Sequence, residues 1–132
     1  MTQISPKTAS QLVAEARQQI ENLPPERVAT EAGSGDALLV DIREPDERLQ
    51  NGFIAGSVSA PRGMLEFWAD PTSPYHREEF QPGRRIVLYC ASSGRSALAS
   101  ATLGQLGYTN VAHLDGGFKA WKEAGLPVEK PQ

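Results

Sequence analysis

The stretch RIVLYCASSGRSALASATLGQL, residues 85–106, joins the clearest strand pattern of the chain to a helical pattern. Residues 85–89 are mostly apolar and include β-branched side chains, which predicts a buried strand. Residues 95–106 repeat small and apolar side chains with helical periodicity, and the small residues CASSG separate the two patterns. A strand that turns through a short loop into a helix indicates an α/β protein.

The same alternation runs along the rest of the chain. Helices are predicted at residues 8–22, 25–33 and 118–125, strands at residues 37–42, 57–61 and 111–114, a short helix within residues 43–52 and helical turns within residues 62–83. Because strands alternate with helices, we expect the sheet to be largely parallel.

The composition narrows the class of protein. The chain of 132 residues is long enough for one domain with its own core. No run approaches the roughly 20 apolar residues of a membrane-spanning helix, so we expect a globular protein with no membrane partner. The net charge of −3 provides no basic field, which excludes nucleic acid as a partner. The N-terminus lacks the pattern of a secretory signal, so we expect a cytoplasmic location.

Cys90 is the single cysteine, which excludes an internal disulfide and a multi-cysteine metal site. The two histidines, His76 and His113, are too far apart in the sequence for metal-ligand spacing, and no metal is expected. We interpret His113, which lies within a strand pattern, as a structural histidine. Cys90 is therefore either a small buried residue at the end of a strand or a reactive thiol.

The residues after Cys90 favour the reactive thiol. A loop of small residues that enters a helix directs backbone N–H groups at one point, where the helix N-terminus adds partial positive charge. A cysteine placed there loses its proton more readily, and its thiolate is the nucleophile. Packing alone gives no reason for SSGRS to follow. We expect the loop to bind an anionic substrate through the backbone from Ala91 onward, the hydroxyls of Ser92, Ser93 and Ser96, the turn at Gly94 and the guanidinium fork of Arg95.

Four motifs resemble those of the rhodanese family, in the same order along the chain: DIREPDE at 41–47, GFIAGSVSAP at 52–61, CASSGRS at 90–96 and LDGGFKAW at 114–121. The resemblance implies a single rhodanese-like domain of three layers, with a central, mainly parallel β-sheet flanked by helices on both faces. It also implies sulfur transfer through a persulfide on Cys90. Phe53, Ala55 and Ser57 depart from the histidine, proline and alanine usual in the second motif, and none of them lies in the loop.

The resemblance also suggests how the chain is divided. We expect residues 37–128 to form the rhodanese-like domain, residues 1–36 a helical extension packed on it, and residues 129–132 a tail. Asp41 and Arg43 follow a buried strand, so we expect them at the sheet edge that carries Cys90. There they either support the pocket or form a structural ion pair or a turn hydrogen bond.

The family's activity implies a thiosulfate sulfurtransferase, in which a small anionic donor gives sulfur to Cys90 and cyanide or a thiol removes it. The covalent persulfide is the intermediate, and no metal or organic cofactor is needed. Two alternatives stay open: a persulfide relay that exchanges sulfur with a protein donor or acceptor, and a regulatory binding module with little turnover. A cysteine phosphatase is disfavoured, because in such enzymes the arginine follows the cysteine one position later than Arg95 follows Cys90.

Overall fold

The computed structural model describes residues 5–131, and its centre is a five-stranded sheet with the strand order β1-β5-β4-β2-β3. The strands are β1 (Glu21–Leu23), β2 (Leu38–Asp41), β3 (Val58–Ser59), β4 (Ile86–Tyr89) and β5 (Val111–Leu114). Every neighbouring pair in the sheet is parallel, which confirms the predicted type of sheet.

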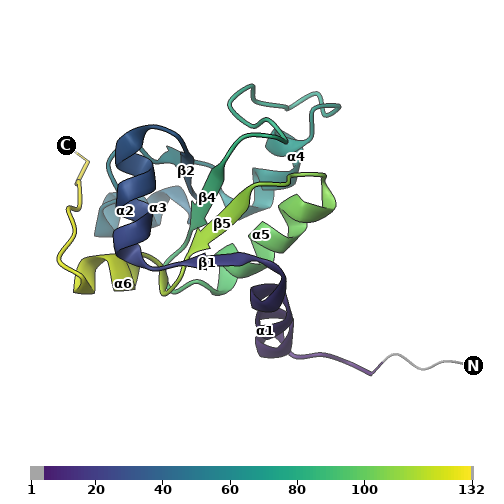
Figure 1. Ribbon diagram of the computed structural model, residues 1–132, viewed down its shortest axis with the longest axis horizontal. Helices are drawn as coiled ribbons and strands as arrows, with labels where there is room; N and C mark the ends of the chain where they lie inside the picture. Colours follow the sequence, from purple (N-terminus) through teal and green to yellow (C-terminus); the bar gives the residue numbers. More distant parts are fainter. Residues whose placement is uncertain (1–4, 132) are drawn as a thin grey trace, which may run out of the picture.

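Helices cover both faces of this sheet. They are α1 (Ala9–Gln19), α2 (Pro25–Ser34), α3 (Pro45–Asn51), α4 (Leu65–Ala69), α5 (Gly94–Gln105) and α6 (Gly117–Glu123), with a 3-10 turn η1 (Arg62–Met64) before α4. In Figure 1, α2 and α6 lie on one side of the sheet and α4 and α5 on the other, with α1 beside α5. The three-layer α/β arrangement is confirmed.

Strand β4 shows how the two faces are separated. Its alternate residues Ile86 and Leu88, followed by Cys90, pack in one buried cluster with side chains of α4 and α5. Val87 and Tyr89 point to the opposite face and pack in a second cluster with side chains of α2 and α6. This two-residue period places the side chain of Cys90 on the α5 face of the sheet.

The helix predicted at residues 8–22 is too long, and a strand was missed. Helix α1 ends at Gln19, Ile20 is extended, and residues 21–23 form the edge strand β1 beside β5. The side-chain amide of Asn22 donates to the backbone carbonyls of Arg17 and Ile20 at 3.0 and 3.2 Å, which satisfies carbonyls at the end of α1. Only Leu23 of β1 is buried, so the segment lacks the alternation of apolar and polar residues that would predict a strand.

The described part of residues 1–36 therefore contains a sheet strand as well as the helices α1 and α2, and the division of the chain at residue 36 stays a prediction. Helix α2 continues one residue beyond the predicted stop at Gly33, because the left-handed residue that ends it is Gly35, at φ 78°. Near the C-terminus, Glu129 of the predicted tail exchanges two backbone hydrogen bonds of 2.8 Å with Phe53. Within residues 5–131, no helix has the length and apolar character needed to cross a membrane.

Candidate functional site

The candidate site lies where the central parallel strands end. Asp41, the last residue of β2, is paired in register with Tyr89, the last residue of β4. Arg43 and Cys90 follow these strands, so both lie at the same edge of the sheet. In open parallel sheets this carboxyl edge is where ligands bind.

The sulfur of Cys90 lies inside the turn from β4 into α5, and the residue is 1% exposed. Sγ accepts hydrogen bonds from the backbone N–H groups of Ser93 at 3.1 Å and Ser96 at 3.4 Å. Ser93 is the one non-glycine residue of the described chain with positive φ, at 90°, and this left-handed conformation turns its N–H toward the sulfur. The loop is thus folded around Cys90 as an anion-binding loop is around its ligand.

Other amides of the loop remain available. Within the described residues, no acceptor bonds the backbone N–H groups of Ala91, Ser92, Gly94 or Arg95. Gly94 and Arg95 open α5, where unsatisfied N–H groups carry partial positive charge. The loop can therefore bind a further negatively charged atom next to the sulfur.

The loop is held against the start of α6. The N–H groups of Phe118 and Lys119 donate to the carbonyls of Cys90 and Ala91 at 2.8 and 3.0 Å. Gly117 has φ 67°, and a Cβ placed there would meet the backbone carbon of Ala91 at 2.6 Å. Gly117 must therefore lack a side chain to let the loop approach.

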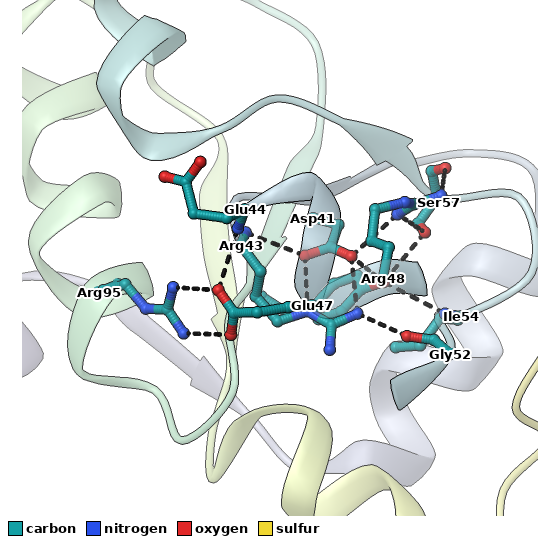
Figure 2. A network of polar contacts seen from close by, with 10 residues as sticks. Asp41, Arg43, Glu44, Glu47, Arg48, Gly52, Ile54, Ser57 and Arg95 are labelled. Carbon is teal, nitrogen blue, oxygen red and sulfur yellow. Dashed lines mark hydrogen bonds and ion pairs between the residues drawn. The ribbon is translucent and has the colours of Figure 1, made fainter. Parts of the chain in front are cut away.

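Arg95 is at the predicted place, but its guanidinium fork is paired with Glu47 of α3. The two nitrogens donate to the two carboxylate oxygens at 2.8 and 2.9 Å, as Figure 2 shows. These hydrogen bonds lower the pKa of Glu47 to about 2, so the carboxylate stays charged at neutral pH. The pKa of Arg95 is raised, first by Glu47 and more weakly by the nearby sulfur of Cys90. Arg95 therefore lies between a carboxylate and the thiol.

Asp41 and Arg43 form the buried ion pair that was one of the two expectations for them. Both residues are at most 1% exposed, and the Arg43 guanidinium donates to Asp41 at 3.0 and 2.9 Å and to the Gly52 carbonyl at 2.8 Å. Asp41 also accepts from Arg48 at 2.9 Å (Figure 2) and from the Tyr89 hydroxyl at 3.0 Å. This network fixes the turn from β2 into α3, which carries Glu47.

The three loop serines differ in what their hydroxyls contact. Ser92 is exposed, so its hydroxyl can meet a substrate. The Ser93 hydroxyl accepts from Arg17 of α1 at 3.4 Å. The Ser96 hydroxyl is buried, 2.8 Å from Nδ1 of His113 and 3.6 Å from Sγ of Cys90. Of the three, Ser96 faces the interior rather than the solvent.

A pocket of about 170 Å³ opens beside the loop. Its lining residues are Arg43, Asn51, Ala91, Phe118, Lys119 and Lys122. The two lysines are exposed on α6, and neither forms an ion pair with another residue of the range 5–131. This rim is cationic although the chain as a whole carries net negative charge. Across residues 5–131, no three His, Cys, Asp or Glu side chains gather as metal ligands would.

Sequence reasoning missed three residues that contact the loop or its supports. Glu47 lies within the quoted motif DIREPDE, and a carboxylate in the first turn of a helix was a usable signal for an arginine partner. Arg17 and Asn22 gave no such signal, because residues 8–22 were predicted as one helix.

Comparison with known proteins agrees with this geometry. The model of the rhodanese-like domain matches residues 24–124. A protein of Allochromatium vinosum called sulfurtransferase is 39% identical over 101 residues, which cover 76% of this chain and 86% of that protein.

Two solved structures extend the likeness. One, from Rhodopseudomonas palustris CGA009, is described as a protein of unknown function and possible tyrosine phosphatase; it is 44% identical, covers 98% of this chain and 99% of its own, and has a TM-score of 0.88. The polysulfide-sulfur transferase homodimer of Wolinella succinogenes is 27% identical, covers 91% of this chain and 85% of its own, and has a TM-score of 0.72. With the family model matching more than half of its residues, the chain belongs to the rhodanese-like domain family.

Proposed function

We propose that the protein is a sulfurtransferase that carries a sulfane sulfur as a persulfide on Cys90, with thiosulfate as a donor and cyanide or a thiol as acceptor. The observation that carries the proposal is the position of Sγ inside a loop of backbone N–H groups at the start of α5. The names of relatives such as the A. vinosum sulfurtransferase support it.

In the first half of the reaction, the Cys90 thiolate attacks the outer sulfur of thiosulfate. The sulfur–sulfur bond of the donor breaks, sulfite leaves with the electron pair, and a new bond joins Sγ to the transferred sulfur. The resulting persulfide anion is stabilised by the loop amides that have no acceptor among the described residues, those of Ala91, Ser92, Gly94 and Arg95.

In the second half, an acceptor attacks the outer sulfur of the persulfide. With cyanide the products are thiocyanate and the Cys90 thiolate, so the protein returns to its starting state. Neither step requires a metal or an organic cofactor, because the electrons move only between sulfur atoms and the nucleophile.

Recognition of an anionic donor needs cationic groups near the loop. The fork of Arg95 is occupied by Glu47, whereas Lys119 and Lys122 line the neighbouring pocket and are exposed. The proposed approach of thiosulfate is therefore along this lysine rim toward Cys90, with Arg95 close to the sulfur.

The test is the mass of the intact protein after incubation with thiosulfate. We expect an adduct of one sulfur atom on the wild type, which cyanide removes with formation of thiocyanate, and no adduct on Cys90→Ser. Ser100→Ala, a substitution at another buried position of α5, should form the adduct at the wild-type rate. A wild type that gains no sulfur from thiosulfate, polysulfide or a persulfidated thiol would exclude the proposal.

The sulfur donor that loads Cys90 distinguishes the enzyme from the relay and the regulatory module. Loading by thiosulfate with rapid turnover supports the enzyme, whereas loading only by a persulfidated thiol supports a relay, and loading without release supports a regulatory module. The R. palustris relative raises a phosphatase as the competing activity. The short spacing between Cys90 and Arg95 and the pairing of Arg95 with Glu47 favour sulfur transfer, so we expect no hydrolysis of para-nitrophenyl phosphate.

A further inference from the structure

A series of hydrogen-bonded polar side chains leads from the half-buried Asn22 of strand β1 to the sulfur of Cys90. Asn22 Oδ1 is 2.6 Å from Nε2 of His113, whose Nδ1 is 2.8 Å from the Ser96 hydroxyl, which is 3.6 Å from Sγ of Cys90. His113 and Ser96 are both fully buried. The alternation of side chains along β5 explains why His113 contacts Ser96 of α5. Ala112 and Leu114 point to the α6 face of the sheet, so His113 points to the α5 face.

The hydrogen bonds fix where each proton lies. The side-chain amide of Asn22 donates to the carbonyls of Arg17 and Ile20, so its oxygen faces His113 and can only accept. Nε2 of His113 therefore carries the ring proton. Burial and, to a smaller extent, the charge of Arg17 lower the pKa of His113 to about 4, so the ring is neutral near pH 7 and Nδ1 is an acceptor.

The Ser96 hydroxyl has one proton and two acceptors for it besides the sulfur, Nδ1 of the neutral His113 at 2.8 Å and the Ser93 carbonyl at 3.2 Å. We take the shorter contact, to His113, as the one that holds the proton. With this proton directed at Nδ1, the serine oxygen presents lone pairs to the sulfur, an arrangement that accepts a bond from a thiol and disfavours a thiolate. A Cys90 thiolate competes with His113 for the same proton.

We propose that His113 and Asn22 are positioning residues that hold the Ser96 hydroxyl proton away from the Cys90 sulfur and so restrain formation of the thiolate. The proposal deepens the proposed function, since it concerns the ionisation of the nucleophile, but its main test does not depend on sulfur transfer. Asn22 lies before residue 24, where the family match begins, so a residue outside the matched range takes part.

Two ion pairs supply the charged groups around this series of side chains. Arg17 of α1 pairs with Asp115, which follows β5, at 2.8 Å, and Arg95 of α5 pairs with Glu47 of α3. None of these groups changes when the neutral His113 is replaced. A change in the titration of Cys90 would therefore come from the hydroxyl proton rather than from lost charge.

The experiment follows the thiolate of Cys90 by its ultraviolet absorbance from about pH 5 to about pH 10, with the spectrum of Cys90→Ser subtracted. Because the chain has a single cysteine, the difference belongs to Cys90. We expect His113→Leu to move the titration to lower pH by about one unit, the effect of one hydrogen bond to a charged group. Asn22→Leu, which frees the histidine to turn its proton toward Ser96, should move it in the same direction.

Removal of the Ser96 hydroxyl tests whether this group causes the shift in the titration of Cys90. In a Ser96→Ala background, His113→Leu should no longer move the titration, whereas in a Ser100→Ala background the full shift should remain. Ser100 is a matched control because it is buried on α5 and its hydroxyl has no partner among the described residues.

Three results would overturn the inference: a shift to higher pH, which would make His113 an acceptor of the thiol proton; no shift; or the same shift without Ser96. Urea unfolding of each variant checks that it is folded during the titration. If these titrations behave as expected but no sulfur adduct forms, the proposed function fails while the inference about Cys90 stands.

Discussion

The guanidinium group of Arg95, expected to bind an anionic substrate, is already paired with a carboxylate in the structure. Its two outer nitrogens contact Glu47, and its charge also acts on the sulfur of Cys90. A carboxylate this close would repel an anionic donor such as the proposed thiosulfate, so Glu47 would weaken the attraction that Arg95 provides. The pair would therefore set the net positive charge that the donor encounters.

Replacement of Glu47 tests whether its negative charge offsets the positive charge of Arg95. We expect Glu47→Gln to lower the KM for thiosulfate by a factor of about 3, because the negative charge beside Arg95 is removed while a hydrogen-bonding side chain remains. The measurement is the rate of thiocyanate formation at several thiosulfate concentrations and low ionic strength. Glu66→Gln, which removes the same charge from a half-buried pair with Arg62, should leave KM unchanged. A higher KM for Glu47→Gln would mean that Glu47 serves instead to orient Arg95 toward the donor.

At the scale of secondary-structure elements, the buried network around Asp41 joins β2, β4 and α3. Asp41 accepts from Arg43, Arg48 and Tyr89, and Arg43 in turn lies over the Phe118 ring at 4.4 Å. A buried arginine that loses its carboxylate keeps an uncompensated charge, which costs more than the pair contributes. The position of α3, and with it Glu47, depends on this network.

Asp41→Asn should therefore destabilise the protein strongly. We expect a loss of about 3 kcal/mol in the free energy of unfolding, measured by urea titration at neutral pH. Asp36→Asn is the control, since Asp36 is exposed and its side chain forms no hydrogen bond within the described residues, and it should change stability little. A small effect at Asp41 would show that water or a rearranged Arg43 compensates for the lost charge.

The elements were predictable where their pattern is local. Strand β4 and helix α5 follow from an apolar run and helical periodicity, and the order of strand, loop and helix is enough to place Cys90 and Arg95 at the sheet edge. Strand β1 was not predictable, because only one of its three residues is buried and its pairing with β5 is a long-range contact. The Glu47–Arg95 pair likewise depends on how α3 and α5 meet in space.

At the scale of the whole molecule, the buried neutral His113 makes stability depend on pH. Its pKa is about 4 in the folded protein, mainly because of burial, against an ordinary value of 6.5. Between these values the unfolded chain binds a proton that the folded protein does not. The stability is therefore fully present above pH 6.5 and falls as the pH drops toward 4.

The effect should be visible in urea unfolding. From pH 6.5 to pH 5.5, which stays above the ordinary pKa of 4.5 at which Glu47 would take up a proton in the unfolded chain, we expect the free energy of unfolding to fall by about 1 kcal/mol. His113→Leu should show little change over the same range. His76→Gln removes the other histidine and should keep the wild-type dependence. Equal pH dependence in the His113→Leu variant would assign the effect to another group.

Cys90 is a free, buried cysteine, and these 132 residues hold no second thiol. A persulfide formed on it would have no cysteine within this chain to displace the sulfur by forming a disulfide. Its lifetime would then be set by the concentration and reactivity of nucleophiles in the surroundings. Such a protein would act as a store of reactive sulfur while acceptors are scarce and as a carrier once they are abundant.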